Sequence, residues 1–309
     1  MLGLPVLRDV HSLAKEMALS PGLLYKLSAA NGKFYQRFEV PKKSGGTRKI
    51  LNPSRQMKAV QAWILRNILD RLNVHQAATG FRSGSNVFQN AVPHRDNRYF
   101  LCLDIEDFFP SILYAKVYKV FRSLGYSAHM AHVLAGLCTC EGRLPQGAVT
   151  SPSLSNLVCI GLDRRISSFV GRRNVAYTRY ADDLTFSSMS PGRLVAIMPT
   201  IRHILDDESF TLNAAKTRRM GPRQQCRVTG LVLSDGEVGV GRKRKRKLRA
   251  AIHSVLLDRP NANDREHHQR HVRGWLAFLA SVDKRGLVQL SSHAARLAQR
   301  HGVPNVLSS

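Results

Sequence analysis

The chain has 309 residues, 43% of them hydrophobic, so it can bury one large core or the cores of two or three subdomains. Lysine and arginine number 47 against 21 aspartates and glutamates, and the net charge of +26 predicts a polyanionic partner, with nucleic acid favoured over an anionic membrane. No apolar run approaches the roughly 18 residues of a spanning helix, and no secretory signal is expected at the N-terminus, which argues against a membrane or exported protein.

The first third of the chain is predicted to contain helices around a strand pair. Ser20 followed by Pro21 is typical of a helix start, because serine caps free backbone N–H groups and proline lacks one. Ser54 is a second predicted N-cap, and apolar residues recur after it at helical spacing. The predicted elements are a helix over 20–30, strands over 34–40 and 48–51 joined by a basic turn, a helix from Ser54, and a strand over 99–103 that ends on Asp104.

The rest of the chain alternates helices and strand pairs before it becomes wholly helical. An Asp-Gly sequence at 235–236 is a strong hairpin signal between two apolar runs. Further predicted elements are helices over 116–124, 128–138 and 153–169, a hairpin of strands 177–180 and 184–187, another helix, a strand pair over 227–233 and 237–240, and helices from 242 onward. This order indicates an α+β core followed by an all-helical C-terminal part.

Acidic residues are scarce, yet two groups of them lie at the ends of apolar strands. Asp104 lies in LCLDIEDFFPSI, and Asp182 and Asp183 lie in YTRYADDLTFS. Carboxylates at strand ends are good ligands for Mg²⁺, and in-line nucleotidyl transfer uses two such ions about 4 Å apart. Because successive strand side chains point to opposite faces, we assign Asp182 the main bridging role beside Asp104 and Asp183 a secondary one. An isolated pair of aspartates would more often be a solvated turn, so the interpretation depends on the surrounding motifs.

Three motifs in order resemble those of the reverse transcriptases. RYADDLTFS resembles the YxDD hairpin, LDIEDFFPSI resembles the strand-borne aspartate motif, and LPQGAVTSPSLSNLV between them resembles the PQG…SP nucleotide-pocket motif. The resemblance implies a right-hand polymerase fold of the α+β class, with fingers, a palm made of an antiparallel sheet with helices on one face, and a helical thumb. We expect N-terminal helices and fingers over 1–96, a palm over 97–235 with a helical finger insertion at about 115–145, and a basic helical thumb over 236–309.

The same resemblance implies an RNA-directed DNA polymerase with a two-metal site. Its catalytic residues would be Asp104, Asp182 and Asp183, which with the backbone carbonyl of Ile105 would hold two Mg²⁺ ions, for which Mn²⁺ can substitute. The substrates would be deoxynucleoside triphosphates.

Five further residues are implied to bind the incoming nucleotide. Lys43 and Arg48 fall on the fingers hairpin, where basic residues clasp the triphosphate, and a guanidinium can do so bidentately. Phe109 would lie under the sugar and exclude a 2′-hydroxyl. Gln146 would contact the nucleotide, beside a glycine that permits close backbone approach. Lys216, in FTLNAAKT, resembles the palm lysine that assists pyrophosphate departure.

Within the reverse transcriptases, the chain most resembles the bacterial retron subfamily. Residues 90–94, NAVPH, match an NAxxH element, residues 228–230 match a VTG element, and HVRGWLAFLASVD at 271–283 resembles the thumb of this subfamily. The resemblance implies synthesis of multicopy single-stranded DNA, primed by a guanosine 2′-hydroxyl within a structured non-coding RNA that is also the template, in anti-phage defence. The expected partners are this RNA, the RNA–DNA product, and an effector or toxin protein of the same system.

The C-terminal region is predicted to hold the RNA. From residue 240 to 309 there are 15 lysines and arginines against 4 acidic residues, and 242–247 is an unbroken basic run whose charges phosphates would neutralise. A solvated face is the alternative for such a run. The predicted RNA-binding residues are Asn90, His94, Val228, Thr229, Gly230, Arg242, Lys243, Arg244 and Lys245. His267, His268 and His271 have helical spacing, but no nearby ligand completes a zinc site.

Two other functions stay open from the sequence. One is a reverse transcriptase of another bacterial class, associated with group II introns or diversity-generating elements, against which the NAxxH and VTG elements argue. The other is a non-catalytic RNA-binding palm protein, against which the three aspartates and Gln146 argue. The five cysteines lack CxxC spacing, so we expect reduced thiols and a cytoplasmic location. No nuclease-like extension is evident, so we expect another protein to remove template RNA.

Overall fold

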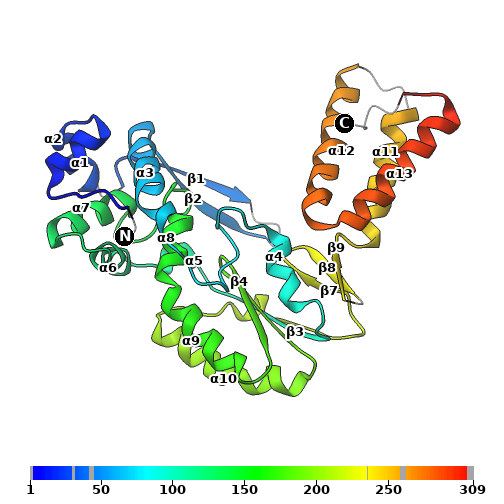
Figure 1. Cartoon of the computed structure of the whole chain (residues 1–309). Coiled ribbons are helices and arrows are strands. Elements are labelled where there is room, and N and C mark those ends of the chain that lie inside the picture. The colour runs from blue at the N-terminus through cyan, green and yellow to red at the C-terminus, as the bar shows by residue number, and fades with distance from the viewer. Residues whose placement is uncertain (1–2, 30–31, 42–44, 235, 258–261, 305–309) are drawn as a thin grey trace.

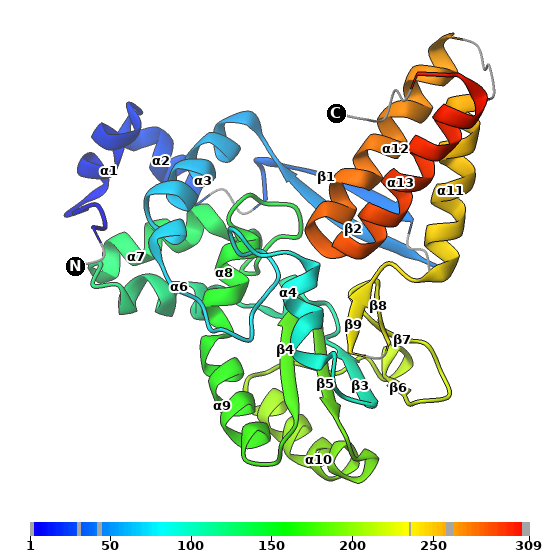
Figure 2. The same ribbon diagram turned by 45° about the vertical axis from the view of Figure 1, so that its right-hand side comes forward.

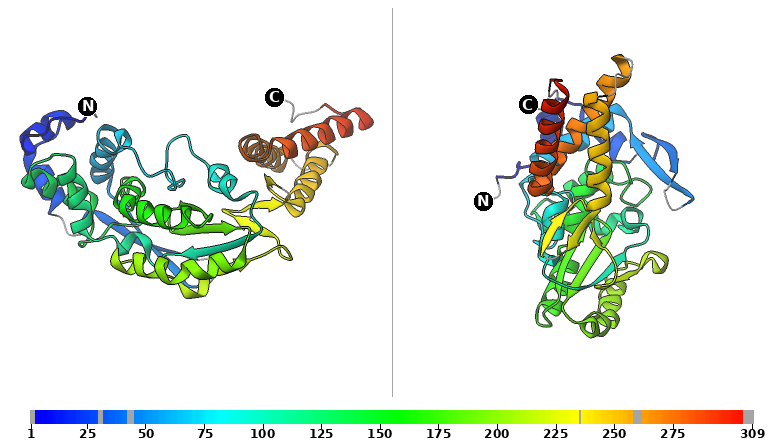
Figure 3. Two further views of the ribbon diagram at one scale, coloured as in Figure 1. Left: turned by 60° about the horizontal axis from the view of Figure 1, so that its bottom comes forward. Right: turned by 90° about the vertical axis from the view of Figure 1, so that its right-hand side faces the viewer.

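The computed structural model describes residues 3–29, 32–41, 45–234, 236–257 and 262–304, and it has an α+β architecture (Figure 1). In Figure 3 the N-terminal helices and the C-terminal helices form two arms, and the central sheet and its helices form the base between them. The predicted right-hand arrangement of fingers, palm and thumb is therefore confirmed at the level of the fold. The residue boundaries proposed for these parts stay predictions. No helix within the described ranges is long and apolar enough to cross a membrane.

The fingers arm is built from capped helices and one strand pair. Ser20 and Ser54 act as N-caps as predicted, because each hydroxyl accepts a backbone N–H three residues further on. An extra helix precedes them, with Asp9 at its N-cap. The elements of this arm are α1 (Val10–Met17), α2 (Pro21–Ser28), β1 (Tyr35–Pro41), β2 (Thr47–Pro53), α3 (Arg55–Asn67), α6 (Tyr114–Ser123) and α7 (Ala128–Cys138).

The palm is a four-stranded antiparallel sheet in the order β4-β5-β3-β6. Its strands are β3 (Tyr99–Asp104), β4 (Ala176–Tyr180), β5 (Asp183–Ser188) and β6 (Arg218–Met220). Helix α9 (Ile160–Gly171) packs on β4, and α10 (Pro191–Asp207) packs on β3 and β5 (Figure 2). Leu101, Tyr177 and Phe186 share the face that meets these helices in one core. Because strand side chains alternate, Asp104 belongs to the opposite face.

One predicted helix of the palm is divided in two. The expected helix over 153–169 is α8 (Ser151–Val158) followed by α9, with Cys159 between them at ψ 3°. That ψ lies outside the helical range, so the chain changes direction there. Short elements complete the palm and its connections: η1 (Leu69–Arg71), α4 (Val87–Ala91), η2 (Val92–His94), α5 (Phe108–Ser111) and η3 (Ala214–Lys216).

The thumb joins the palm through a separate three-stranded sheet. Its strands are β7 (Cys226–Val228), β8 (Leu231–Ser234) and β9 (Glu237–Gly239), followed by α11 (Arg242–Leu257), α12 (Ala262–Val282) and α13 (Lys284–His301). The predicted single strand over 227–233 is wrong. Thr229 and Gly230 have φ of 45° and 84°, so they form a turn between β7 and β8. The predicted pairing on either side of 235 is confirmed as β8 with β9.

Candidate active site

Two strand ends bring the predicted catalytic aspartates together. Asp104 ends β3 and is the register partner of Asp183, the first residue of β5. The backbone N–H of Ile105 donates to the carbonyl oxygen of Asp182 at 3.0 Å, so the strand end and the turn are directly joined. Ala181 makes this tight turn at φ 58°. The structure therefore places all three carboxylates at one corner of the sheet, with Asp183 rather than Asp182 directly opposite Asp104.

This group of carboxylates is short of positive charge. Burial, followed by the neighbouring Asp182 and Asp104, raises the pKa of Asp183 to about 6. Burial and the Asp104 charge also raise the pKa of Asp182, while Lys216 and Arg48 oppose that rise. Crowded carboxylates that resist ionisation gain from a cation, which is the electrostatic setting of a divalent metal site.

Lys216 supplies the one cation in direct contact with Asp104 among the described side chains. Its ammonium lies 2.8 and 2.9 Å from the two carboxylate oxygens of Asp104, and this bond raises the pKa of Lys216. Within the described ranges, no three His, Cys, Asp or Glu side chains are already arranged around one point as metal ligands. Carboxylate oxygens are the ligands that Mg²⁺ prefers. The ammonium of Lys216 neutralises Asp104 in this structure, as a bound Mg²⁺ would otherwise do.

The fingers hairpin is attached to the loop that carries Gln146. The Leu51 N–H donates to the Gln146 carbonyl oxygen at 2.8 Å. Gly147 has φ 119°, and a Cβ there would lie 2.9 Å from both the Ile50 side chain and the Leu51 carbonyl oxygen. The neighbour that approaches Gly147 in the structure is strand β2, and the expected approach of a nucleotide stays a prediction. Arg48 is exposed on the same strand and acts electrostatically on Asp182, whereas Lys43 lies outside the described residues.

Phe109 leaves the end of β3 on the short helix α5. It is half-buried, and its ring centroid lies 5.4 Å from that of Phe108 and 6.0 Å from that of Phe81. Phe108 is buried in the palm core. Phe109 therefore has one face against the fold and part of its surface free.

A buried ion pair beneath the aspartates was missed by the sequence analysis. Both side chains of the Arg179–Asp163 pair are fully buried, and the guanidinium donates to the two carboxylate oxygens at 2.8 and 2.6 Å. Arg179 also donates to the Ala181 carbonyl oxygen at 3.2 Å, in the turn that carries Asp182. Asp163 is followed directly by Arg164 and Arg165 on α9, so no local pattern singled out Arg179 as its partner.

A family model described as Reverse transcriptase (RNA-dependent DNA polymerase) matches residues 40–233. The retron Ec86 reverse transcriptase of Escherichia coli is 40% identical over 303 residues, which cover 97% of this chain and 93% of that protein. The chain belongs to the retron reverse transcriptases. A second relative, the retron Mx65 reverse transcriptase of Myxococcus xanthus, is 35% identical over 322 residues, covering 96% of this chain and 72% of that protein.

Among solved structures, a telomerase from Candida albicans in complex with a fragment of telomeric RNA matches with 12% identity. The TM-score is 0.49, and the match covers 86% of this chain and 60% of that one. The sequence relatives therefore assign the family, and they favour the retron group over the other bacterial classes that the motifs left open.

In this retron reverse transcriptase, the NAxxH element is inside the fold. Asn90 is fully buried, and its side-chain oxygen accepts from the Thr79 hydroxyl at 2.7 Å. His94 is also fully buried, with its ring nitrogens 2.7 and 2.8 Å from the hydroxyls of Ser187 and Thr178. The prediction that these side chains bind RNA is not what the structure shows. They connect α4 and η2 to the palm sheet, because their polar groups have partners inside the protein.

The VTG element lies at the turn between β7 and β8. Val228 is buried in the thumb core, so its predicted contact with RNA could involve only its backbone. Thr229 is partly exposed, and it lies 3.4 Å from the Asn90 amide nitrogen, while Gly230 is exposed. The two predicted RNA elements therefore touch each other across the base of the thumb.

The basic run at the start of α11 has two kinds of residue. Lys245 pairs with the buried carboxylate of Asp283 at 3.1 Å, and the Arg244 guanidinium lies 4.8 Å from the centre of the Trp275 ring. Both side chains therefore help to hold the thumb helices together. Arg242 and Lys243 are exposed and retain the surface position expected of phosphate-binding residues.

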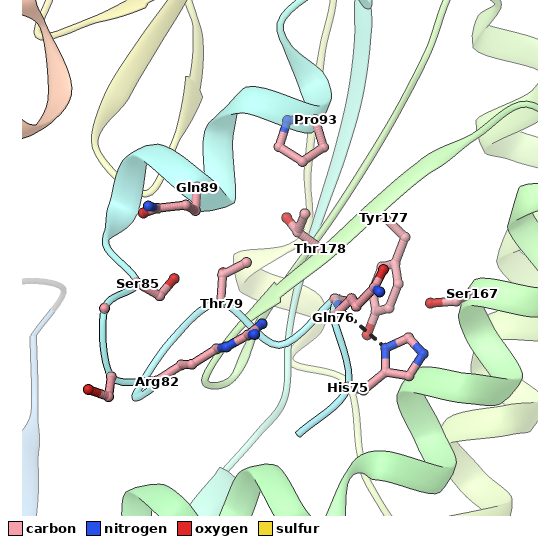
Figure 4. A pocket seen from close by; sticks show the side chains of 13 residues that line it. His75, Gln76, Thr79, Arg82, Ser85, Gln89, Pro93, Ser167, Tyr177 and Thr178 are labelled. Atoms are coloured by element: carbon pink, nitrogen blue, oxygen red, sulfur yellow. Dashed lines mark hydrogen bonds between the residues drawn. The ribbon is translucent and has the colours of Figure 1, made fainter. Parts of the chain in front are cut away.

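A cavity of about 710 Å³ lies beside β4, at the edge of the palm (Figure 4). His75, Arg82, Gln89 and Tyr177 are among its lining residues. None of the predicted catalytic, nucleotide-binding or RNA-binding residues lines it. The cavity is thus distinct from the corner that carries the aspartates.

Proposed function

We propose that this reverse transcriptase makes multicopy single-stranded DNA from a structured non-coding RNA that is both primer and template. The observation that supports the catalytic part is the cluster of Asp104, Asp182 and Asp183 at one corner of the sheet, in which burial and the neighbouring carboxylates raise the pKa of Asp182 and Asp183. The retron relatives and the net charge of +26 support the RNA partner.

The reaction is an in-line displacement, in which a primer hydroxyl attacks the α-phosphorus and pyrophosphate leaves. Asp104, Asp182, Asp183 and the backbone carbonyl of Ile105 would hold two Mg²⁺ ions, which would supply activation of the hydroxyl and neutralisation of the triphosphate charge. Arg48 would bind the triphosphate oxygens from the fingers side. Lys216 carries a proton at Nζ beside Asp104 and would deliver it to the departing pyrophosphate.

The remaining residues select and place the nucleotide. Gln146, fixed by the bond from Leu51 to its carbonyl oxygen, would contact the incoming nucleotide. Phe109 would close the space under the sugar, where its half-exposed ring excludes a 2′-hydroxyl. Arg242 and Lys243 would hold the folded RNA so that its priming hydroxyl meets the aspartates. Anti-phage defence with an effector protein is the proposed biological setting, and the cytoplasm the proposed location.

Primer extension by Asp104→Asn and Asp182→Asn variants tests the catalytic assignment. Each change removes a ligand charge, so we expect synthesis to fall by at least about a thousandfold, equivalent to several kcal/mol of lost electrostatic stabilisation, while RNA binding is retained. Asp107→Asn is the matched control, since Asp107 is exposed in the same motif and its φ of 43° suits asparagine equally well. Near-normal extension by either catalytic variant would contradict the assignment and favour a non-catalytic RNA-binding protein.

The nucleic acid that copurifies with the protein tests the substrate. Sequencing should recover one structured RNA joined to DNA copied from the same RNA. A mixed population of cellular RNAs without attached DNA would contradict the retron product.

A further inference from the structure

Phe81 combines two features that are unfavourable for a phenylalanine. Its side chain is 45% exposed and so loses part of the free energy that burial of an apolar ring provides. Its backbone is left-handed, with φ 57°. A left-handed conformation is a genuine outlier for a bulky residue and costs of order 1 kcal/mol or more. Such a residue persists only where the surrounding structure imposes the conformation.

The ring of Phe81 extends the aromatic surface of the nucleotide pocket. Its centroid lies 6.0 Å from that of Phe109 and 6.3 Å from that of Tyr180, the first residue of the catalytic YADD sequence. Phe109 follows Asp104 on α5, and Tyr180 ends β4 just before the turn that carries Asp182. Phe81 therefore lies between the other two rings, and the three form one aromatic cluster beside the aspartates with an exposed ring at its centre.

The segment that carries Phe81 is fixed to the catalytic hairpin. Ala77 and Thr79 exchange backbone hydrogen bonds with Arg179, at 2.7 and 2.9 Å. The next residue, Gly80, accepts a hydrogen bond from the Asn156 amide at 2.8 Å, and a Cβ at Gly80 would lie 2.9 Å from the Ala181 nitrogen. The turn that bears the aspartates and the segment that bears Phe81 are thus held as one unit.

We propose that Phe81 is a nucleic-acid contact residue that packs against the sugars and base edges of the newest base pair of the RNA–DNA duplex. This inference rests on the proposed function. An exposed aromatic ring can contact any base or sugar, so it can bind the duplex without sequence specificity. The shallow minor groove of an RNA-type duplex exposes those sugars and base edges to an apolar ring.

The chain offers a variant that separates binding from folding. Asparagine tolerates a left-handed backbone, so Phe81→Asn removes the ring without adding strain. We expect a preannealed RNA template–DNA primer to dissociate on the order of tenfold faster, because one base–aromatic contact is worth about 1–3 kcal/mol. The thermal unfolding midpoint should be unchanged or higher. Phe81→Tyr keeps the ring and should restore wild-type dissociation, and Tyr25→Asn, at a 42% exposed ring on α2, is the control.

A Phe81→Trp variant gives a direct readout that does not depend on stability. Its indole emission, measured against the wild-type signal of Trp63 and Trp275, should change when the duplex is added without nucleotides. Wild-type dissociation in Phe81→Asn, or an unchanged indole signal, would overturn the proposal. The dissociation rate and the indole emission both report duplex binding and do not require catalysis. Polymerase activity in Asp104→Asn would therefore contradict the catalytic assignment without changing the conclusion about Phe81.

Discussion

The buried Arg179–Asp163 ion pair supports the turn that carries Asp182, because Arg179 donates to the Ala181 carbonyl oxygen in that turn. The Asp163 carboxylate accepts from Arg179 and from the Tyr177 hydroxyl at 2.8 Å, and Arg179 also reaches Asn156 at 3.1 Å. All four side chains lie in the interior of the palm, where water cannot replace a lost partner. The position of the aspartates therefore depends on a charge pair that never meets substrate.

We predict that Asp163→Asn destabilises the protein by about 3–5 kcal/mol, because it leaves the buried Arg179 charge without its counterion. Urea unfolding measures this loss. Asp207→Asn is the control, since it breaks a pair with Arg165 whose side chains are 41% and 40% exposed, and it should leave the unfolding midpoint nearly unchanged. Equal effects of the two substitutions would show that the buried pair has no special role.

A second residue-scale prediction concerns sugar selection by Phe109. Phe109→Val shortens the ring that would close the space under the sugar, so ribonucleotides should be incorporated at least about tenfold more readily relative to deoxynucleotides. Matched single-nucleotide incorporation assays give this ratio. Phe108→Val, in the buried neighbour, should instead lower stability and leave the ratio unchanged. An unaltered ratio in Phe109→Val would assign that residue to the core.

At the scale of elements, the thumb helices are anchored at one carboxylate. Asp283 accepts from the N–H groups of Val240 at 3.1 Å and Gly286 at 2.7 Å, and it pairs with Lys245. It thereby joins the end of β9, the start of α11 and the start of α13. The basic run thus contributes both to thumb structure and to the exposed surface.

We predict that Arg242→Gln with Lys243→Gln weakens RNA binding without changing stability. The slope of log affinity against log salt should become shallower by about 0.7–0.9 for each phosphate contact that is lost. Self-primed synthesis should fall more than extension of a preannealed DNA primer, because only the former requires the folded RNA to be positioned.

The control for this pair is Arg164→Gln on α9 with Arg172→Gln at the C-cap of that helix, two exposed residues whose substitution removes the same charge. Similar losses in self-primed synthesis and in extension of a preannealed primer would show that Arg242 and Lys243 attract nucleic acid without positioning the folded RNA. No loss in either assay would show that these two residues are solvent-exposed and do not bind RNA.

For the whole molecule, the buried His94 predicts sensitivity to acid. Burial lowers the pKa of His94 from 6.5 to about 3, so the folded protein keeps the ring neutral while the unfolded chain takes up a proton below pH 6.5. The contribution to stability is complete above pH 6.5 and is lost as the pH falls towards 3, by up to about 1.4 kcal/mol per pH unit.

Urea unfolding at pH 7.5 and 5.5 measures this loss. His94→Gln removes the titrating group and should flatten the dependence, although the protein will be less stable at pH 7.5. An equally steep dependence in that variant would place the acid sensitivity elsewhere.

The sequence by itself determined the features that depend on neighbouring residues. The N-caps at Ser20 and Ser54, the strand ends that carry Asp104 and Asp183, and a glycine after Gln146 that permits close backbone approach follow from local pattern and motif. Local rules suffice there because cap bonds, strand alternation and backbone freedom are properties of a few consecutive residues.

Only the tertiary structure decided which polar residues face inward. His94 meets Ser187 across 93 positions of sequence, and Asn90 meets Thr229 across 139, so no local pattern distinguishes them from exposed RNA ligands. The same applies to Arg179, whose counterion lies on another element, and to Phe81, whose ring joins Phe109 and Tyr180 only after folding. A polar or aromatic side chain acquires its role from the partners that the fold brings to it, because burial and electrostatic environment are set by long-range contacts.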